Sequence, residues 1–377
     1  MDAVEIQERY LKITKRYLVL GGIWPTQKKS AQYIYRVIIY IVMVPTVLAQ
    51  LARVIWFFDM TTLLQQLSFF LAMVLLLIKQ AAYIINDAKF KALLDGMYND
   101  WKKDRTKEEI AIMISYMDRG AFYSSIYIAS AYFAMMLFLQ MPWWPRVADI
   151  LMPLNASRPR GYIFPAYYYV DDDKYYYWII AYSSIATIIT VCGYIACDIY
   201  FIYAVQHACG LFTVAGYAKA IDDFYYGILF IVVGMTIGAF SSTLFWVSSL
   251  NFILTDDSNL SDDSSLLYIF SKQLSKMKPC AQFYEYIVFL TIQLLHIFFL
   301  AIQGQFMINR TDIVYNQIYE GQWYNSVPKT QELFILALRT AMNPPQITAG
   351  GVIAMNLQTF AEVVKVSFSY YTVLQTV

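Results

Sequence analysis

Long apolar runs separated by short polar segments dominate this chain and predict membrane-spanning helices. A helix needs about 20 mostly apolar residues to cross a bilayer. Six runs are long and apolar enough, and a seventh is weaker because it carries charged and hydroxyl side chains. The six strong runs are 33–58, 63–85, 121–141, 177–205, 224–253 and 283–308, and the weaker run is 355–377. The pattern therefore predicts an all-α membrane protein with seven transmembrane helices.

The polar residues of the seventh run leave two compatible interpretations open. A helix that faces lipid on all sides should be apolar on all sides, whereas polar residues at membrane depth favour a cavity or a pathway. Glu362 and Lys365 are three residues apart and could form an ion pair within the helix, near the inner interface. The same residues could also belong to a water-exposed face that lines a pore, whether or not they pair.

Two segments between the spans also show helical spacing. Apolar residues recur at helical intervals in 86–119, which predicts that the second and third helices continue below the membrane. A similar pattern covers 311–338 and is broken near Pro328. Pro344–Pro345 then stops the chain, and Gly350–Gly351 allows a sharp turn before the seventh span. The last helix is therefore predicted to be split, with a cytosolic half inside 309–347 and a membrane half in 355–377.

The distribution of Lys and Arg predicts the orientation. With the N-terminal segment 1–32 in the cytoplasm, the inner segments hold eighteen Lys and Arg and the outer loops hold seven. Basic residues concentrate on the cytoplasmic side of membrane proteins. We therefore expect a cytoplasmic N-terminus and an extracellular C-terminus, the reverse of a G-protein-coupled receptor. No cleavable signal peptide is expected, because the first 30 residues have no uninterrupted apolar core.

The largest outer loop, 142–176, is rich in tyrosine and carries a short acidic run. Its tyrosines suit either an aromatic belt at the membrane interface or a lid over a ligand pocket. Asn155 begins an Asn-Ala-Ser glycosylation sequon in this loop, where modification is possible. A second sequon at Asn309 falls on the cytoplasmic side and should stay unmodified.

Composition removes several classes of function. The chain is 59% hydrophobic, 15% charged and has a net charge of +1, which argues against a nucleic-acid partner. Its four cysteines and two histidines have no metal-ligand spacing, and no nucleophile–base arrangement stands out. We expect no metal, no cofactor and no enzymatic activity. A solute transporter is disfavoured because no internal repeat is visible and ionisable residues within the spans are few.

Several motifs resemble the insect odorant receptor family. The C-terminal third contains Gly304–Gln305, Trp323–Tyr324 and Thr348-Ala-Gly-Gly351, followed by the run LQTFAEVVKVSFSYYTVL. The block from Gln206 to Phe212 and the outer-loop residues Phe164-Pro-Ala166 are also similar to this family. One departure is the short interval 218–223 before the fifth span, and the segment 255–282 is longer than usual. The resemblance covers most of the chain.

The resemblance implies a ligand-gated, non-selective cation channel in the plasma membrane of a sensory neuron dendrite. This chain would be a tuning subunit that binds a small volatile odorant and assembles with a co-receptor subunit in a heterotetramer surrounded by lipid. A gustatory-type ligand-gated channel shares this architecture and remains the alternative. Cytosolic helices would contact neighbouring subunits, and the seventh helix would line the pore with Val373 at the gate. The subunit-contact residues are Trp323, Tyr324 and Leu333, and the pore residues are Tyr370, Val373, Leu374 and Gln375.

A site for a small volatile ligand should be mostly apolar with one or two polar groups. The outer halves of the second, third, fourth and sixth spans supply adaptable methionines and shape-defining aromatics. Each of these residues could instead serve ordinary helix packing. The candidate ligand contacts are Phe69, Phe70, Met73, Tyr132, Met135, Met136, Ile179, Ser183, Ala186, Tyr284, Phe289 and Ile292.

Overall fold

The computed structural model describes residues 5, 8–151, 160–211, 214–256, 277–321, 323–342 and 346–375. At some positions within these helices, including 249–256 and 277–285, only the backbone is described. Asn155, with its sequon, and Pro344–Pro345 lie outside the described residues.

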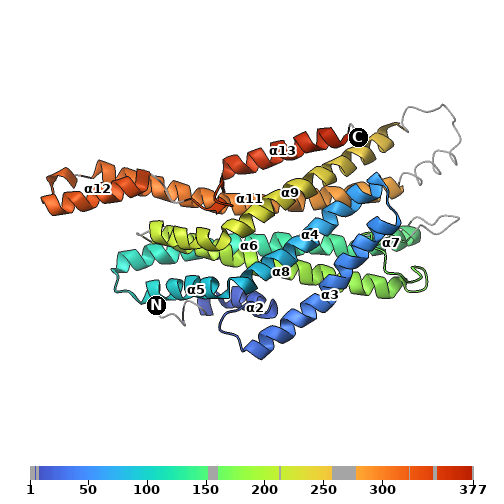
Figure 1. Ribbon diagram of the computed structural model, residues 1–377, viewed down its shortest axis with the longest axis horizontal. Coiled ribbons are helices and arrows are strands. Elements are labelled where there is room, and N and C mark those ends of the chain that lie inside the picture. The colour runs from blue at the N-terminus through green and yellow to red at the C-terminus, as the bar shows by residue number, and fades with distance from the viewer. Residues whose placement is uncertain are drawn as a thin grey trace.

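Long helices arranged side by side form an elongated bundle (Figure 1). Within the described residues, six helices are long and apolar enough to cross a membrane. They correspond to the six strong runs of the sequence, so the all-α membrane fold is confirmed. These helices are α3 (Lys29–Trp56), α4 (Met60–Ile85), α6 (Lys107–Gln140), α8 (Tyr176–Gly210), α9 (Val214–Asp256) and α11 (Met277–Glu320).

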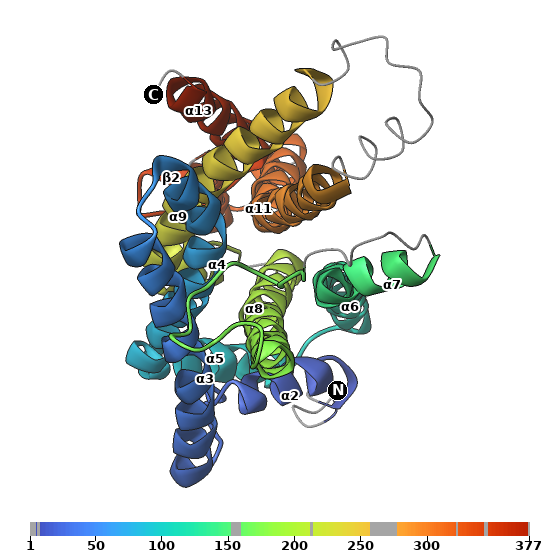
Figure 2. The ribbon, with the colours of Figure 1, turned by 90° about the vertical axis from the view of Figure 1, so that its right-hand side faces the viewer.

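Shorter elements complete the bundle at its two ends. Helices α5 and α12 lie at one end of the long axis, and α7 lies at the other (Figure 1). The weaker seventh run forms α13, which packs along α9 (Figure 1 and Figure 2). The shorter elements are α2 (Lys12–Leu20), α5 (Asp87–Lys102), η1 (Met141–Trp143), α7 (Trp144–Leu151), η3 (Trp323–Asn325), α12 (Pro328–Met342) and α13 (Leu357–Gln375).

Local sequence signals explain where the cytosolic helices begin. Thr106 accepts a hydrogen bond from the Glu109 backbone N–H at 3.2 Å, and the Glu109 carboxylate accepts from the Thr106 N–H at 2.9 Å. This capping box starts α6 well below the apolar run. Pro328 begins α12, where its missing N–H costs nothing. The predicted helical extensions at 86–119 and around Pro328 are therefore confirmed.

A two-stranded hairpin separates α12 from α13, as expected for a split last helix. Strand β1 (Thr348–Ala349) pairs with β2 (Ile353–Ala354) in an antiparallel register. Gly350 and Gly351 turn the chain with φ angles of +67° and +71°, which favour glycine. The Asp222 carboxylate of α9 accepts hydrogen bonds from the Thr348 N–H at 2.6 Å and from the Thr348 hydroxyl at 2.7 Å. The Thr-Ala-Gly-Gly motif is thus a turn that is fixed to α9.

The inner half of α8 forms the centre of the largest core. Every residue from Ile195 to Gly210 is buried. Tyr200 and Phe201 are fully enclosed and pack with Phe90 of α5 and Tyr225 of α9. The short interval 218–223 is not a loop, because α9 begins at Val214 and runs through it as a continuous helix. Helices α8 and α9 therefore pack against each other without the longer loop that is usual between these two spans.

Candidate functional site

Aromatic rings and methionines from several helices gather in the outer half of the bundle. Phe69 of α4 lies 5.0 Å from Phe289 and 5.9 Å from Tyr286 of α11, measured between ring centroids. Trp246 of α9 stacks on Tyr286 at 5.8 Å, with an interplanar angle of 13°. Phe138 of α6 meets Phe289 edge-on at 5.9 Å. We call this group the outer aromatic cluster; its buried members are Met43, Phe69, Met73, Leu76, Phe138, Ile163, Phe164, Tyr286, Val288 and Phe289.

Several predicted ligand residues meet in this cluster. Phe69, Met73 and Phe289 are buried members, and Ile292 packs against them. Met135 and the α8 residues Ile179, Ser183 and Ala186 are buried without being members of the cluster, and Phe70 is half-buried. The structure thus brings four of the predicted residues together and leaves the others at separate positions in the bundle.

Two predicted ligand residues, Tyr132 and Met136, lie elsewhere, and a third, Tyr284, has no described side chain. The Tyr132 hydroxyl lies 2.5 Å from the Tyr17 hydroxyl of α2, in a separate group with Tyr127 and Phe299. Met136 is 60% exposed and points away from the bundle. Tyr284 lies in α11, but its side chain is outside the described residues. Conversely, sequence reasoning missed Tyr286, Trp246 and Phe138, which lie in the same apolar runs at unremarked positions.

A set of charged and polar side chains lies deeper in the bundle, between helices of which most also contribute to the outer aromatic cluster. Lys79 Nζ of α4 donates to Asp198 Oδ1 of α8 at 2.6 Å, and both side chains are almost fully buried. Tyr127 donates its hydroxyl hydrogen to Asp198 Oδ2 at 2.6 Å. His296 Nε2 of α11 lies 3.1 Å from both Asp198 Oδ2 and Lys79 Nζ. We call Lys79, Asp198, His296 and Tyr127 the inner charged network.

The inner charged network joins four helices and satisfies its own charges. A buried carboxylate is stable only when paired and hydrogen-bonded, and Asp198 has three such partners. Tyr194 connects the network to the outer aromatic cluster. Its ring lies 4.8 Å from Lys79 Nζ and 5.4 Å from the His296 ring, and its hydroxyl donates to the Ala72 carbonyl at 2.8 Å. Sequence reasoning did not connect these residues; the single ionisable residues Lys79, Asp198 and His296 within three different spans were the signal.

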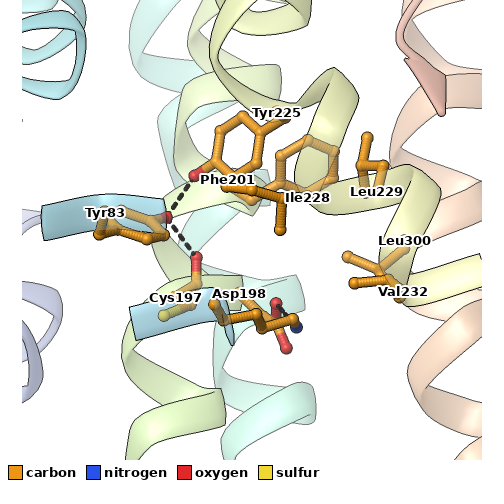
Figure 3. Close-up of a pocket in the computed structure, with 10 residues that line it drawn as sticks. Tyr83, Cys197, Asp198, Phe201, Tyr225, Ile228, Leu229, Val232 and Leu300 are labelled. Atoms are coloured by element: carbon orange, nitrogen blue, oxygen red, sulfur yellow. Dashed lines mark hydrogen bonds and ion pairs between the residues drawn. The ribbon is translucent and has the colours of Figure 1, made fainter. Parts of the chain in front are cut away.

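A cavity of about 10 Å³, near the lower limit for one water molecule, adjoins the network. Figure 3 shows Tyr83 at its edge, where its hydroxyl donates to the Cys197 carbonyl at 3.1 Å and lies 2.5 Å from the Tyr225 hydroxyl. Asp198 lies beside Cys197, and apolar residues of α9 together with Leu300 of α11 close the opposite side. The cavity is too small for an organic ligand.

Helix α13 buries one face and leaves the other uncovered. Thr359, Val363 and Ser367 are buried, at helical spacing on one face. Tyr370 and Val373 are each 58% exposed, whereas Leu374 is half-buried and the Gln375 side chain is outside the described residues. The uncovered face is apolar at its outer end, which a single chain in water would not expose.

The charged residues of α13 do not pair as one interpretation proposed. Glu362 accepts a hydrogen bond from Gln358 Nε2 at 2.9 Å. Within the described residues, no ion pair joins Glu362 to Lys365, and both side chains are exposed. The interpretation of an intrahelical ion pair is therefore wrong, and two charged side chains stay on the uncovered part of the helix.

Helix α11 connects the outer aromatic cluster to the start of α13. Phe289 and Ile292 contact the cluster, and His296 follows one turn later. The Phe298 ring lies 5.6 Å from Phe360 of α13. At Gly304 the helix lies so close to the Met355 carbonyl that a Cβ would collide with it. Glycine here permits a direct backbone contact between α11 and the chain entering α13.

The C-terminal part of α11 extends beyond the bundle together with η3 and α12 (Figure 1). Trp323 is half-buried at a cavity of about 450 Å³, and Tyr324 is 61% exposed. Leu333 lies in α12, but its side chain is outside the described residues. Apolar side chains also remain exposed on this arm, including Ile335 at 52% and Leu336 at 57%. The arm therefore has an uncovered apolar surface.

A second buried acid stabilises α5 against α8 on the inner side. The Asp100 carboxylate accepts from Lys103 Nζ at 2.6 Å and lies 3.4 Å from His207 Nε2. Burial raises the pKa of Asp100, but the hydrogen bonds from His207 and Lys103 outweigh burial and hold the pKa below its ordinary value. Asp100 therefore carries a negative charge and connects the two helices. The His207 block that resembled the family thus has a packing role.

Comparison with known proteins reveals both sequence and fold relatives. Odorant receptor 2a of Drosophila melanogaster is 28% identical over 88 residues, which are 23% of this chain and 22% of that protein. The match thus spans about a fifth of that relative's length. The insect olfactory receptor OR5 from Machilis hrabei in complex with eugenol has the same fold, with a TM-score of 0.75 over the full length of both chains at 13% identity. A second structure of OR5 gives a TM-score of 0.71 over 99% of both chains at 14% identity.

The family described as 7tm Odorant receptor matches residues 59–218 and 267–368. These ranges cover most of the chain and include the outer aromatic cluster's α4, α6 and α11 residues and the first part of α13, up to Phe368. Members of this family are receptors and not enzymes. Because the match covers well over half of the sequence and the fold agrees along its whole length, the chain belongs to the 7tm odorant receptor family.

Proposed function

We propose that this chain is the tuning subunit of an odorant-gated, non-selective cation channel that it forms with a co-receptor. One observation carries the proposal. A closely packed aromatic cluster in the outer half of the bundle is connected, through α11, to a helix that leaves one apolar face uncovered. The first feature suits a volatile ligand and the second suits a pore between subunits.

The outer aromatic cluster supports the ligand role. It combines ring faces, ring edges and the Met43 and Met73 side chains, which together give shape and adaptability. The OR5 structure that shares this fold was solved with eugenol bound. We propose that a small volatile molecule occupies the cluster and contacts Phe69, Met73 and Phe289.

The uncovered face of α13 supports the pore role. Val366, Tyr370 and Val373 follow one another at helical spacing on that face and are all exposed. A ring of such side chains, one from each subunit, would exclude water and close the pore, because an ion loses hydration there without replacement. We propose Val373 as this subunit's contribution to the gate, with Tyr370, Leu374 and Gln375 beside it.

The cytosolic arm supports the assembly role. Tyr324, Ile335 and Leu336 expose apolar surface that neighbouring subunits would cover, and Trp323 lines the adjacent cavity. We propose that Trp323, Tyr324 and Leu333 contact the co-receptor in a heterotetramer at the plasma membrane of a sensory dendrite.

The test is expression with and without a co-receptor, with current recorded against an odorant panel. We expect odorant-evoked, non-selective cation current with both chains present and little or none with this chain alone. Variants of Trp323 and Leu333 to Ser should reduce recovery of the pair without altering the apparent affinity of channels that do assemble. Robust current from this chain alone would contradict the tuning-subunit role, and absence of evoked current with the co-receptor would contradict the channel role.

A further inference from the structure

A buried side-chain amide on α4, next to the outer aromatic cluster, lacks hydrogen-bond partners in the described part of the chain. Gln66 of α4 is 1% exposed. Among the described residues, neither its Nε2 nor its Oε1 has a hydrogen-bond partner. Leaving a buried polar group unpartnered is unfavourable, and most such groups in proteins find a partner. The amide therefore needs an explanation that packing alone does not supply.

Helical spacing places Gln66 on the face of α4 that forms the cluster. Residues three, four and seven apart share one face of a helix, so Gln66 lies above Phe69 and Met73 on the same stripe. The neighbouring polar residue Ser68 lies on another face and has partners there. Its hydroxyl lies 2.7 Å from the Ser242 hydroxyl and 3.0 Å from the Thr243 hydroxyl of α9. On α4, Ser68 thus finds partners on α9, whereas Gln66 finds none among the described residues on the cluster's face.

A second unpartnered polar atom belongs to the same cluster. Trp246 packs against it through Tyr286, whose ring lies 5.9 Å from Phe69, one turn from Gln66 on the same face of α4. Among the described residues, the Trp246 indole N–H has no hydrogen-bond acceptor, although its ring stacks on Tyr286. Gln50 Oε1 is also without a donor at the Met73 end, where Gln50 Nε2 contacts the Met73 sulfur at 3.0 Å.

We propose that Gln66, with Trp246, forms the polar end of the odorant site and selects ligands that combine an apolar body with one hydroxyl or carbonyl oxygen. This inference rests on the proposed function and specifies its ligand class. The Gln66 amide can donate to a carbonyl and can both donate to and accept from a hydroxyl, and the Trp246 N–H donates to either. A hydrocarbon of the same shape would leave these groups unpartnered. A site built to hydrogen-bond a ligand oxygen rejects the analogue that lacks it.

Matched ligand pairs test the proposal directly. In 2-phenylethanol and propylbenzene a hydroxyl replaces a methyl group, and in acetophenone and α-methylstyrene a carbonyl oxygen replaces a methylene. Binding is measured on the purified full-length chain in detergent, as ligand-induced stabilisation against heat. We expect the oxygenated member of at least one pair to bind about tenfold or more tightly than its hydrocarbon partner.

Two variants make the assignment specific. Gln66→Leu should reduce the preference to about threefold or less, mainly by weakening binding of the oxygenated member while hydrocarbon binding stays equal or improves. Gln65→Leu, a neighbouring change on a different face of α4, should keep the wild-type preference. A merely structural role of Gln66 would weaken both members of a pair equally.

Every outcome decides the proposal. Equal stabilisation of the wild-type chain by both members of each pair, including no stabilisation by either, overturns it without reference to any variant. An unchanged preference in Gln66→Leu also overturns it. Because the readout is binding, these failures are distinct from the failure of the channel role, which shows as absence of evoked current with the co-receptor.

Discussion

The inner charged network and the outer aromatic cluster both place polar atoms inside the bundle, but they treat them in opposite ways. Asp198 accepts from Lys79 and Tyr127 and lies 3.1 Å from His296 Nε2, so its charge is compensated within the chain. Gln66 and Trp246 have unpartnered atoms among the described residues. A self-satisfied group holds helices together, whereas an unsatisfied group is complete only with something else bound. Under the proposed ligand role, the contrast separates a structural element from a binding element within one helix, α4.

The largest expected effect comes from breaking the inner charged network. Asp198→Leu leaves the Lys79 ammonium buried without its counter-charge, which should cost about 3–5 kcal/mol of stability and most surface expression. The double variant Lys79→Met/Asp198→Leu removes both charges and should recover most of that loss. Thermal denaturation in detergent and surface labelling measure both. Equal losses in the single and double variants would show that the ion pair is not the source of the effect.

A substitution in the outer aromatic cluster should change the potency of ligands and not only the stability of the protein. Phe289→Leu removes a ring that contacts Phe69 and Phe138, and it should change the potency of some odorants by about tenfold and alter their rank order. Phe90→Leu is the matched control, because it also removes a buried ring but lies in the inner core with Tyr200. Currents across an odorant panel measure both variants. Uniform scaling of all responses in Phe289→Leu would remove this residue from the ligand site.

A change at Val373 tests whether the pore is separate from the inner charged network and the outer aromatic cluster. Val373→Thr places a hydroxyl of similar size on the uncovered face of α13 and should wet the gate, raising current without odorant by less than tenfold. The effect is partial because the co-receptor supplies the rest of the ring. Odorant rank order should stay fixed. Val363→Thr, on the face buried against α9, should instead lower expression without raising basal current. Normal surface expression with unchanged basal current in Val373→Thr would argue against the gate position.

The smallest expected effect is that of Met136→Ala, which is compared with the adjacent methionine of α6, Met135. Met135 is 5% exposed and Met136 is 60% exposed. Met135→Ala should create a cavity and cost about 2–5 kcal/mol at most, whereas Met136→Ala should stay within about 0.5 kcal/mol and leave every odorant response unchanged. Denaturation and dose–response curves measure the pair. A shift in odorant rank order in Met136→Ala would mean that the exposed side of α6 contacts ligand.

Sequence patterns predicted the helices far better than the contacts between them. Apolar length was enough to find α3, α4, α6, α8, α9 and α11, because a bilayer demands that length whatever the helices touch. In helices that are apolar on all sides, the sequence could not predict which side would be buried. Met135 and Met136 look equivalent in the sequence, and only the packing of α6 against α8 distinguishes them.

The candidate site was predictable only in part, for a related reason. Lys79, Asp198 and His296 come from three different spans, and each occurs singly among apolar neighbours. Their meeting depends on how α4, α8 and α11 are rotated about their axes, which local pattern does not determine. The Thr-Ala-Gly-Gly turn was predictable because glycine at positive φ leaves a local trace in the sequence.

The close backbone contact between Gly304 and Met355 gives α11 the geometry of a lever. Phe289 lies fifteen residues before this point and Glu320 sixteen residues after it, so each arm is roughly 22–24 Å long at a rise of about 1.5 Å per residue. A rigid helix turning about Gly304 by about 3° moves both ends by about 1 Å in opposite directions, since displacement scales with arm length. Under the proposed ligand role, a rigid tilt of α11 that moved Phe289 would therefore move the far arm of α11 by a similar distance. The start of α13, at the pivot, receives rotation with almost no translation.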